Sequence, residues 1–103
     1  MIKDKALKAF TKEVREAFGI HLKRLLLFGS RARGDFTEWS DYDILLVFDL
    51  LTPEMEEKVE EIGDRMLLEY DALFTTFSLT EADLERRRFE PFLMNAKKEG
   101  IPL

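Results

Sequence analysis

LLLFGSRARG at positions 25–34, followed by SDYDILLVF at positions 40–48, is the stretch that decides the fold of this chain. The first segment predicts an apolar strand, a Gly-Ser turn and a short helix over residues 30–34. The second predicts a strand over about residues 41–49 that begins with two carboxylates. Four successive apolar residues at 25–28, without alternation, are typical of a strand covered on both faces. The stretch therefore predicts two buried strands joined by a turn, a short helix and a polar loop.

Asp41 and Asp43 lie two residues apart at the start of the second strand. Because strand side chains alternate between faces, we expect both carboxylates on one face, about 6–7 Å apart along the chain. The alternative is that Asp41 caps the strand and Asp43 is an exposed edge residue. An acid directly before an apolar run is costly to bury unless it is paired or bound to a metal. This cost favours a Mg²⁺ site, since Mg²⁺ prefers oxygen ligands.

Gly29 and Ser30 form the turn between the first strand and the short helix. Backbone N–H groups at such a turn favour an anion such as phosphate. Arg31 and Arg33 project from the same helix, where each is either a solvated surface residue or a contact to a polyphosphate, and we favour the phosphate contact for Arg33. A phosphate-binding turn beside two metal-binding carboxylates is suited to a nucleoside triphosphate with Mg²⁺.

Helices flank the two strands along the chain. Apolar residues at helical spacing predict a helix over about residues 4–18 that stops at Gly19. A Thr-Pro pair at 52–53 predicts the start of another helix, which reaches about residue 69. A third strand is expected over residues 70–78, with Asp71 at its start.

The C-terminal quarter predicts two more helices and a tail. The first helix begins at Thr80 and runs through Leu84 to three arginines at 86–88, and the second follows Pro91 and stops at Gly100. The apolar tail, residues 101–103, is expected to pack on the sheet or on another copy of the chain, which leaves a homo-oligomer possible.

Composition limits the class of protein. A chain of 103 residues is expected to form a single domain, residues 1–103, with a core of its own. It has no cysteine, which excludes disulfides and thiol chemistry, and its net charge of −5 argues against broad nucleic-acid binding. No apolar run is long enough to span a membrane, and no signal-peptide segment begins the chain, so we expect a cytoplasmic protein.

Gly29-Ser30, ten intervening residues and Asp41-x-Asp43 together resemble the signature of the DNA polymerase beta-type nucleotidyltransferases. The short length points to their smallest members, the minimal nucleotidyltransferases. The resemblance is densest over residues 25–48, and the order of strands and helices extends it over nearly the whole chain. It implies an α+β (α/β) fold, a mixed β-sheet of the nucleotidyltransferase type with helices packed on it.

The resemblance also implies a reaction, the transfer of a nucleoside monophosphate, AMP from ATP, to an acceptor hydroxyl. Two Mg²⁺ ions would be held by the catalytic carboxylates Asp41, Asp43 and Asp71, and the nucleotide by Gly29, Ser30 and Arg33. The family carries its third carboxylate inside an apolar strand. Asp71 lies at the start of the expected strand instead, so a capping role stays open for it.

Minimal nucleotidyltransferases are found beside HEPN-domain proteins as toxin–antitoxin pairs, in which the nucleotidyltransferase is the antitoxin and adenylylates a tyrosine of the toxin. The resemblance therefore implies a HEPN partner that completes the acceptor site, because the chain ends before the helical domain of larger members could start. Two alternatives stay open. The chain could neutralise its partner by occlusion without catalysis, or transfer a nucleotide to a small molecule.

Overall fold

Segments 22–28 and 42–48 pair as the central strands of a four-stranded sheet in the computed structural model, which describes residues 4–103. The sheet order is β3–β2–β1–β4, with bounds β1 Leu22–Phe28, β2 Tyr42–Phe48, β3 Phe74–Thr80 and β4 Ile101–Pro102. Strand β1 runs antiparallel to both β2 and β4, whereas β2 and β3 are parallel. The sheet is therefore mixed, and the predicted fold class is confirmed.

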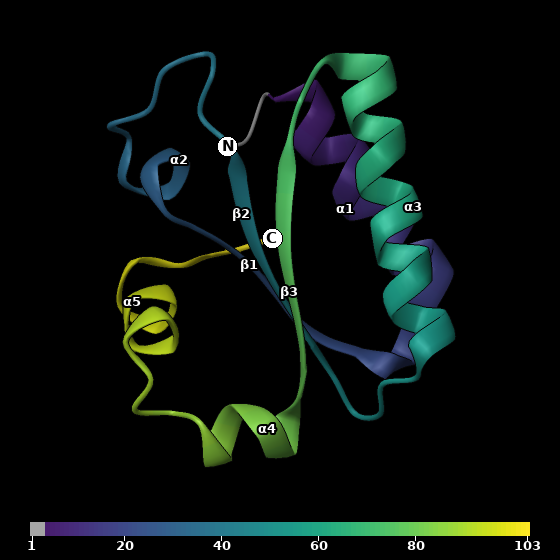
Figure 1. The fold of residues 1–103 in the computed structure, drawn as a ribbon, viewed down its shortest axis with the longest axis vertical. Helices are drawn as coiled ribbons and strands as arrows, with labels where there is room; N and C mark the ends of the chain where they lie inside the picture. The colour runs from purple at the N-terminus through teal and green to yellow at the C-terminus, as the bar shows by residue number, and fades with distance from the viewer. Residues whose placement is uncertain (1–3) are drawn as a thin grey trace.

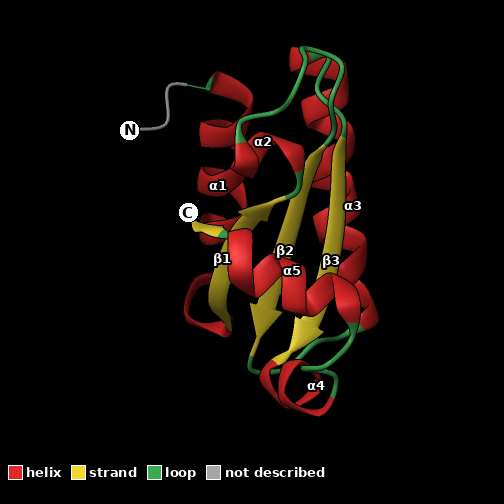
Figure 2. Ribbon diagram, turned by 90° about the vertical axis from the view of Figure 1, so that its left-hand side faces the viewer, coloured by secondary structure: helices red, strands yellow, loops and turns green. Residues whose placement is uncertain are grey.

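Helices cover both faces of this sheet (Figure 1). Helices α1 (Lys5–Phe18) and α3 (Pro53–Tyr70) pack side by side on one face, and α5 (Pro91–Glu99) lies on the other. The short helix α2 (Ser30–Arg33) follows β1, and α4 (Glu81–Arg86) follows β3 at the far end of the sheet. Figure 2 shows α5 crossing in front of the strands. A single 3₁₀ turn, η1 (Gly19–His21), joins α1 to β1.

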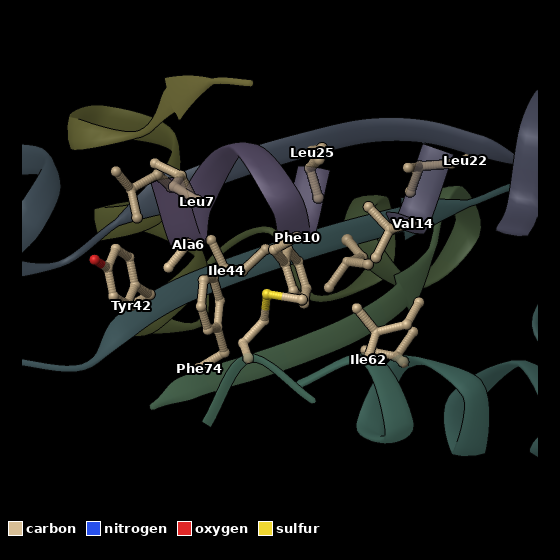
Figure 3. Packing of buried hydrophobic residues seen from close by; sticks show 14 of the residues in the cluster. Ala6, Leu7, Phe10, Val14, Leu22, Leu25, Tyr42, Ile44, Ile62 and Phe74 are labelled. Atoms are coloured by element: carbon tan, nitrogen blue, oxygen red, sulfur yellow. The ribbon is translucent and has the colours of Figure 1, made fainter. Parts of the chain in front are cut away.

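Alternation along β2 divides the core into two layers. Side chains at positions 42, 44, 46 and 48 join the cluster formed with α1 and α3, and those at 45 and 47 join the cluster formed with α5. Phe10 of α1 is fully buried and lies among residues of the sheet and α3 (Figure 3). The Phe74 ring stacks on the rings of both Phe10 and Tyr42, each at a centroid distance of 4.5 Å. These three rings tie α1 to β2 and β3.

The predicted helix boundaries at both long helices are confirmed. The Asp4 carboxylate accepts the N–H of Leu7 at 3.0 Å and caps α1, which ends at Gly19 with φ 55°. The Thr52 hydroxyl accepts the N–H of Met55 at 3.2 Å and caps α3. Each cap satisfies a backbone N–H that has no partner inside the helix.

The third strand begins later than the sequence predicts. A strand over residues 70–78 is wrong, because α3 continues to Tyr70 and β3 starts at Phe74. Leucine and glutamate at positions 67–69 are good helix formers and extend α3 by about one turn beyond its buried stripe. Asp71 ends the helix in the left-handed conformation, with φ 54°, which an aspartate tolerates better than most residues.

The C-terminal segment packs on the sheet, one of the two alternatives for the tail. Ile101 and Pro102 pair with Leu27 and Leu26 of β1 as the edge strand β4. Helix α4 is shorter than predicted and ends at Arg86, before the other two arginines. Within residues 4–103, no helix has the length and apolar composition that crossing a membrane requires.

The ring stack predicts a strong dependence of stability on Phe10. Replacing Phe10 by alanine removes a fully buried ring between α1 and β3, so we expect the free energy of unfolding to fall by about 3–5 kcal/mol. Chemical denaturation measures the change. The control Leu68→Ala removes a side chain that is 84% exposed on α3 and should change stability by less than about 0.5 kcal/mol. Equal effects of the two substitutions would contradict the packing described.

Candidate active site

The backbone of Gly29 lies directly against the carboxylate of Asp43. Phe28 is opposite Asp43 in the antiparallel register of β1 and β2, so the chain leaves β1 beside this acid. Gly29 has φ 75°, and a Cβ built on it would lie 2.1 Å from Oδ2 of Asp43. Any side chain at this position would force the Asp43 carboxylate to move. The register and the glycine together bring the predicted phosphate-binding turn next to the predicted metal-binding pair.

Asp41 and Asp43 lie on the same face of the sheet, as predicted. Thr75 of β3 is opposite Asp43 in the parallel register, and its hydroxyl donates to Oδ2 of Asp41 at 3.1 Å. This face continues into the layer under α5 through Leu45 and Val47. Thr75 is a site residue that the sequence did not single out, because only the register of β3 places it beside the two acids.

Like charges make the ionised form of Asp43 unfavourable. Partial burial raises the pKa of its carboxyl, and the negative charges of Asp41 and Glu99 raise that pKa further, while the guanidinium of Arg33 opposes them. A cation held between two such carboxylates would relieve their repulsion. The oxygen-only donor set of Asp41 and Asp43 fits Mg²⁺.

Arg33 and Gly29 share an unexpected partner, Glu99 at the end of α5. The N–H of Gly29 donates to Oε1 of Glu99 at 3.0 Å, and Nη1 of Arg33 donates to Oε1 at 3.1 Å and to Oε2 at 3.3 Å. Arg33 also contacts Asp35 at 3.3 Å, and hydrogen bonds to these two acids raise its pKa. The Gly29 amide and Arg33 therefore already bind an anionic group, a carboxylate of the same chain.

Arg31 has a structural role that neither of its two predicted roles describes. Its side chain is only 11% exposed, with Cζ 3.9 Å from the centroid of the Tyr42 ring. Its Nε donates to the backbone oxygen of Ser40 at 2.9 Å. This cation–π contact and hydrogen bond hold the loop that leads into β2, and thus fix the position of Asp41 at the start of that strand.

A pocket of about 400 Å³ opens beside Asp41, between the start of α1, the loop before β2 and the end of α3. Its lining includes Trp39, Tyr70, Asp71 and Leu73. The Trp39 side chain is 80% exposed. The pocket gives Asp41 an open side with aromatic walls.

Asp71 lines the same pocket as Asp41 but caps α3 instead of lying on a strand. The strand position beside Asp43 is held by Thr75, which is not an acid. Within residues 4–103, no three acidic or histidine side chains lie close enough to share a metal ion. The predicted placement of Asp71 on a strand next to the pair is therefore wrong, because Asp71 caps the end of α3 and β3 begins only at Phe74.

Residues 7–99 match the nucleotidyltransferase domain family. The chain belongs to this family. Two curated relatives of this chain come from Methanocaldococcus jannaschii. "Putative protein adenylyltransferase MJ0604" is 32% identical over 100 residues, which cover 97% of this chain and 96% of the relative. "Putative protein adenylyltransferase MJ0141" is 40% identical over 70 residues, which cover 67% of this chain and 71% of the relative.

Solved structures share the fold of this nucleotidyltransferase. A nucleotidyltransferase structure from Sulfolobus solfataricus superposes with a TM-score of 0.60 and 26% identity, covering 95% of this chain and 76% of that chain. A toxin–antitoxin structure with AMP-PNP gives a TM-score of 0.60 at 17% identity, covering 90% of this chain and 68% of that one. A mutant of the MntA–HpeT toxin–antitoxin gives a TM-score of 0.62 at 15% identity, covering 96% of this chain and 72% of that chain. The last two show likeness of fold.

The close approach of Gly29 to Asp43 predicts that Gly29→Ala loses nucleotide affinity, an effect that backbone strain alone does not cause. Gly29→Ala should lower stability by about 1–3 kcal/mol through its positive φ and should also displace the Asp43 carboxylate, so that Mg²⁺-ATP binding weakens at least about tenfold. Gly19→Ala is the matched control, because Gly19 also has a positive φ but open space around its Cβ. Thermal denaturation and calorimetric titration separate the two effects. Equal ATP affinity in both variants would contradict the contact.

Burial of the Asp43 carboxyl, together with charge repulsion, predicts that Asp43→Asn stabilises the protein at neutral pH without added metal. Because the folded-state pKa is raised, ionisation of Asp43 destabilises the fold as pH rises through that pKa. We expect a gain of roughly 0.5 kcal/mol, or about 2–4 °C in Tm, that disappears below the ordinary pKa of 3.8, where the carboxyl is protonated in both states. Melting curves across this pH range measure it. A gain that grows as the pH falls would reverse the sign and contradict the argument.

Proposed function

We propose that this chain transfers AMP from ATP to a hydroxyl group of a partner protein. The observation that carries the proposal is the contact between Gly29 and Asp43, with Asp41 on the same face of the sheet. Two curated relatives carry the name protein adenylyltransferase, and both matches extend over at least two thirds of this chain. Their names support the choice of adenylyl transfer to a protein.

In this proposal, Asp41 and Asp43 would hold the two Mg²⁺ ions. Bound Mg²⁺ would neutralise the triphosphate and the charge that develops at the α-phosphorus. The backbone N–H groups of Gly29 and Ser30 and the guanidinium of Arg33 position the β- and γ-phosphates. These groups do mostly positioning and charge neutralisation, which is what phosphoryl chemistry requires of a protein.

The acceptor enters through the pocket beside Asp41. Its hydroxyl oxygen forms a bond to the α-phosphorus while the bond to the β-phosphate bridge breaks, and pyrophosphate leaves. Asp71 lines this pocket and is the third catalytic carboxylate of the proposal; it accepts the hydroxyl proton. The exposed Trp39 and Tyr70 rings suit an aromatic acceptor such as a tyrosine side chain.

The partner that we propose is a HEPN-domain toxin, with this chain as its antitoxin. Two structures of the same fold come from toxin–antitoxin proteins, and one of them contains the ATP analogue AMP-PNP. The pocket is open on one side, so a partner surface would complete the acceptor site. As an ATP-dependent antitoxin, the chain would act in the cytoplasm, where ATP is supplied.

Occlusion of the partner without catalysis is the second candidate. It is favoured by the absence of a three-carboxylate cluster within residues 4–103 and by the Glu99 carboxylate on the phosphate-binding turn. Transfer to a small molecule has no comparable observation in its favour.

Transfer of label separates the two candidates. The chain is incubated with α-labelled ATP, Mg²⁺ and the proposed HEPN-domain partner, and label on the partner is measured. Asp41→Asn and Asp43→Asn should each reduce transfer by about 10³-fold or more, and Asp71→Asn by about 10²-fold. Asp64→Asn, an exposed acid on α3, is the control and should leave transfer unchanged. If the partner is neutralised without receiving label, and both Asp41→Asn and Asp43→Asn still neutralise it, catalysis would be overturned in favour of occlusion.

A further inference from the structure

The Glu99 carboxylate occupies the donors that the nucleotide would need. It accepts the N–H of Gly29 at 3.0 Å, and its two oxygens accept Nη1 of Arg33 at 3.1 and 3.3 Å. The side chain is 22% exposed, so it lies against the turn and still reaches solvent. A carboxylate and a phosphate are both anions that accept N–H donors, and one backbone N–H cannot serve both at full strength.

The sheet register places Glu99 at this position. Strand β4 pairs antiparallel with β1, with Ile101 opposite Leu27. Gly29 directly follows β1 and Glu99 ends α5 just before β4, so the pairing of these two strands brings the two segments together. Backbone pairing at the sheet edge therefore delivers the acid to the turn, and this placement does not depend on an isolated surface contact.

Negative charge around the turn opposes a second anion. Asp43, Asp35 and Glu99 all lie near Arg33, and Glu99 is close enough to Asp43 to act on its charge. A polyphosphate would meet an occupied N–H, an occupied guanidinium and three carboxylates. Rotation of the Glu99 side chain into solvent frees both donors and removes one negative charge, and it requires no movement of β4.

We propose that Glu99 is the internal ligand of the phosphate-binding turn, and that a polyphosphate binds by exchanging places with its carboxylate. The proposal rests on the proposed function only in that the exchanging ligand is the triphosphate of the nucleotide. It makes Glu99 a residue that sets nucleotide affinity. The apparent association constant of the chain equals the intrinsic association constant multiplied by the fraction of molecules in which Glu99 has left the turn.

The proposal predicts tighter binding when the Glu99 charge is removed. In Glu99→Gln and Glu99→Ala, isothermal titration with inorganic tripolyphosphate and Mg²⁺ should give a Kd roughly three to ten times lower than in the unmodified chain. Glu90→Gln is the matched control. Glu90 lies at the other end of α5, forms a similar pair with Arg87 at 2.6 and 3.0 Å, and should leave Kd unchanged. Melting curves establish that each variant is folded at the titration temperature.

A resonance experiment follows the exchange itself in the unmodified chain. Added tripolyphosphate should shift both the Gly29 amide resonance and the side-chain carboxyl carbon of Glu99, with the same midpoint. Unchanged or weaker binding in both Glu99 variants would overturn the proposal, as would a Gly29 shift without a Glu99 shift, or no binding by any form.

These outcomes are independent of catalysis. Tripolyphosphate contains no transferable nucleotide, so tighter binding in the Glu99 variants supports the exchange even if no label reaches a partner protein. Label transfer by the unmodified chain, together with unchanged affinity in the variants, would sustain the proposed function and reject the exchange.

Discussion

The contact between the Gly29 backbone and the Asp43 carboxylate is the constraint on which the rest of the site depends. It follows from the antiparallel register of β1 and β2, which sets Phe28 opposite Asp43, and from the lack of a side chain at Gly29. The chain must then turn sharply, form α2 and return to begin β2. Arg31 secures that return by bonding Ser40. One pairing register thus joins the predicted phosphate-binding turn to two acids.

Much of this part of the molecule could be predicted from the sequence, because short-range rules decide it. Alternation along β2 placed Asp41 and Asp43 on one face, and the order of apolar runs and caps gave the two central strands and the two long helices. The strand expected from residue 70 begins only at Phe74, because Asp71 ends α3 in the left-handed conformation and the chain needs residues 71–73 to enter β3.

Residues that reach the site over long range could not be predicted in the same way. Glu99 arrives through the pairing of a two-residue strand, for which the sequence has no periodic signal. Thr75 arrives through a parallel register that depends on the length of α3. Trp39 is a further case, since its exposure depends on the path of the loop that Arg31 holds.

Crystals of the chain grown with Mn²⁺ and a non-hydrolysable ATP analogue test the central claim most directly, because the anomalous signal of Mn²⁺ locates the metal without assumptions. The account predicts an anomalous peak bound by the carboxylates of Asp41 and Asp43, with the terminal phosphates on the N–H groups of Gly29 and Ser30. A peak elsewhere, or a triphosphate bound away from Gly29 while the two acids lack metal, would contradict it.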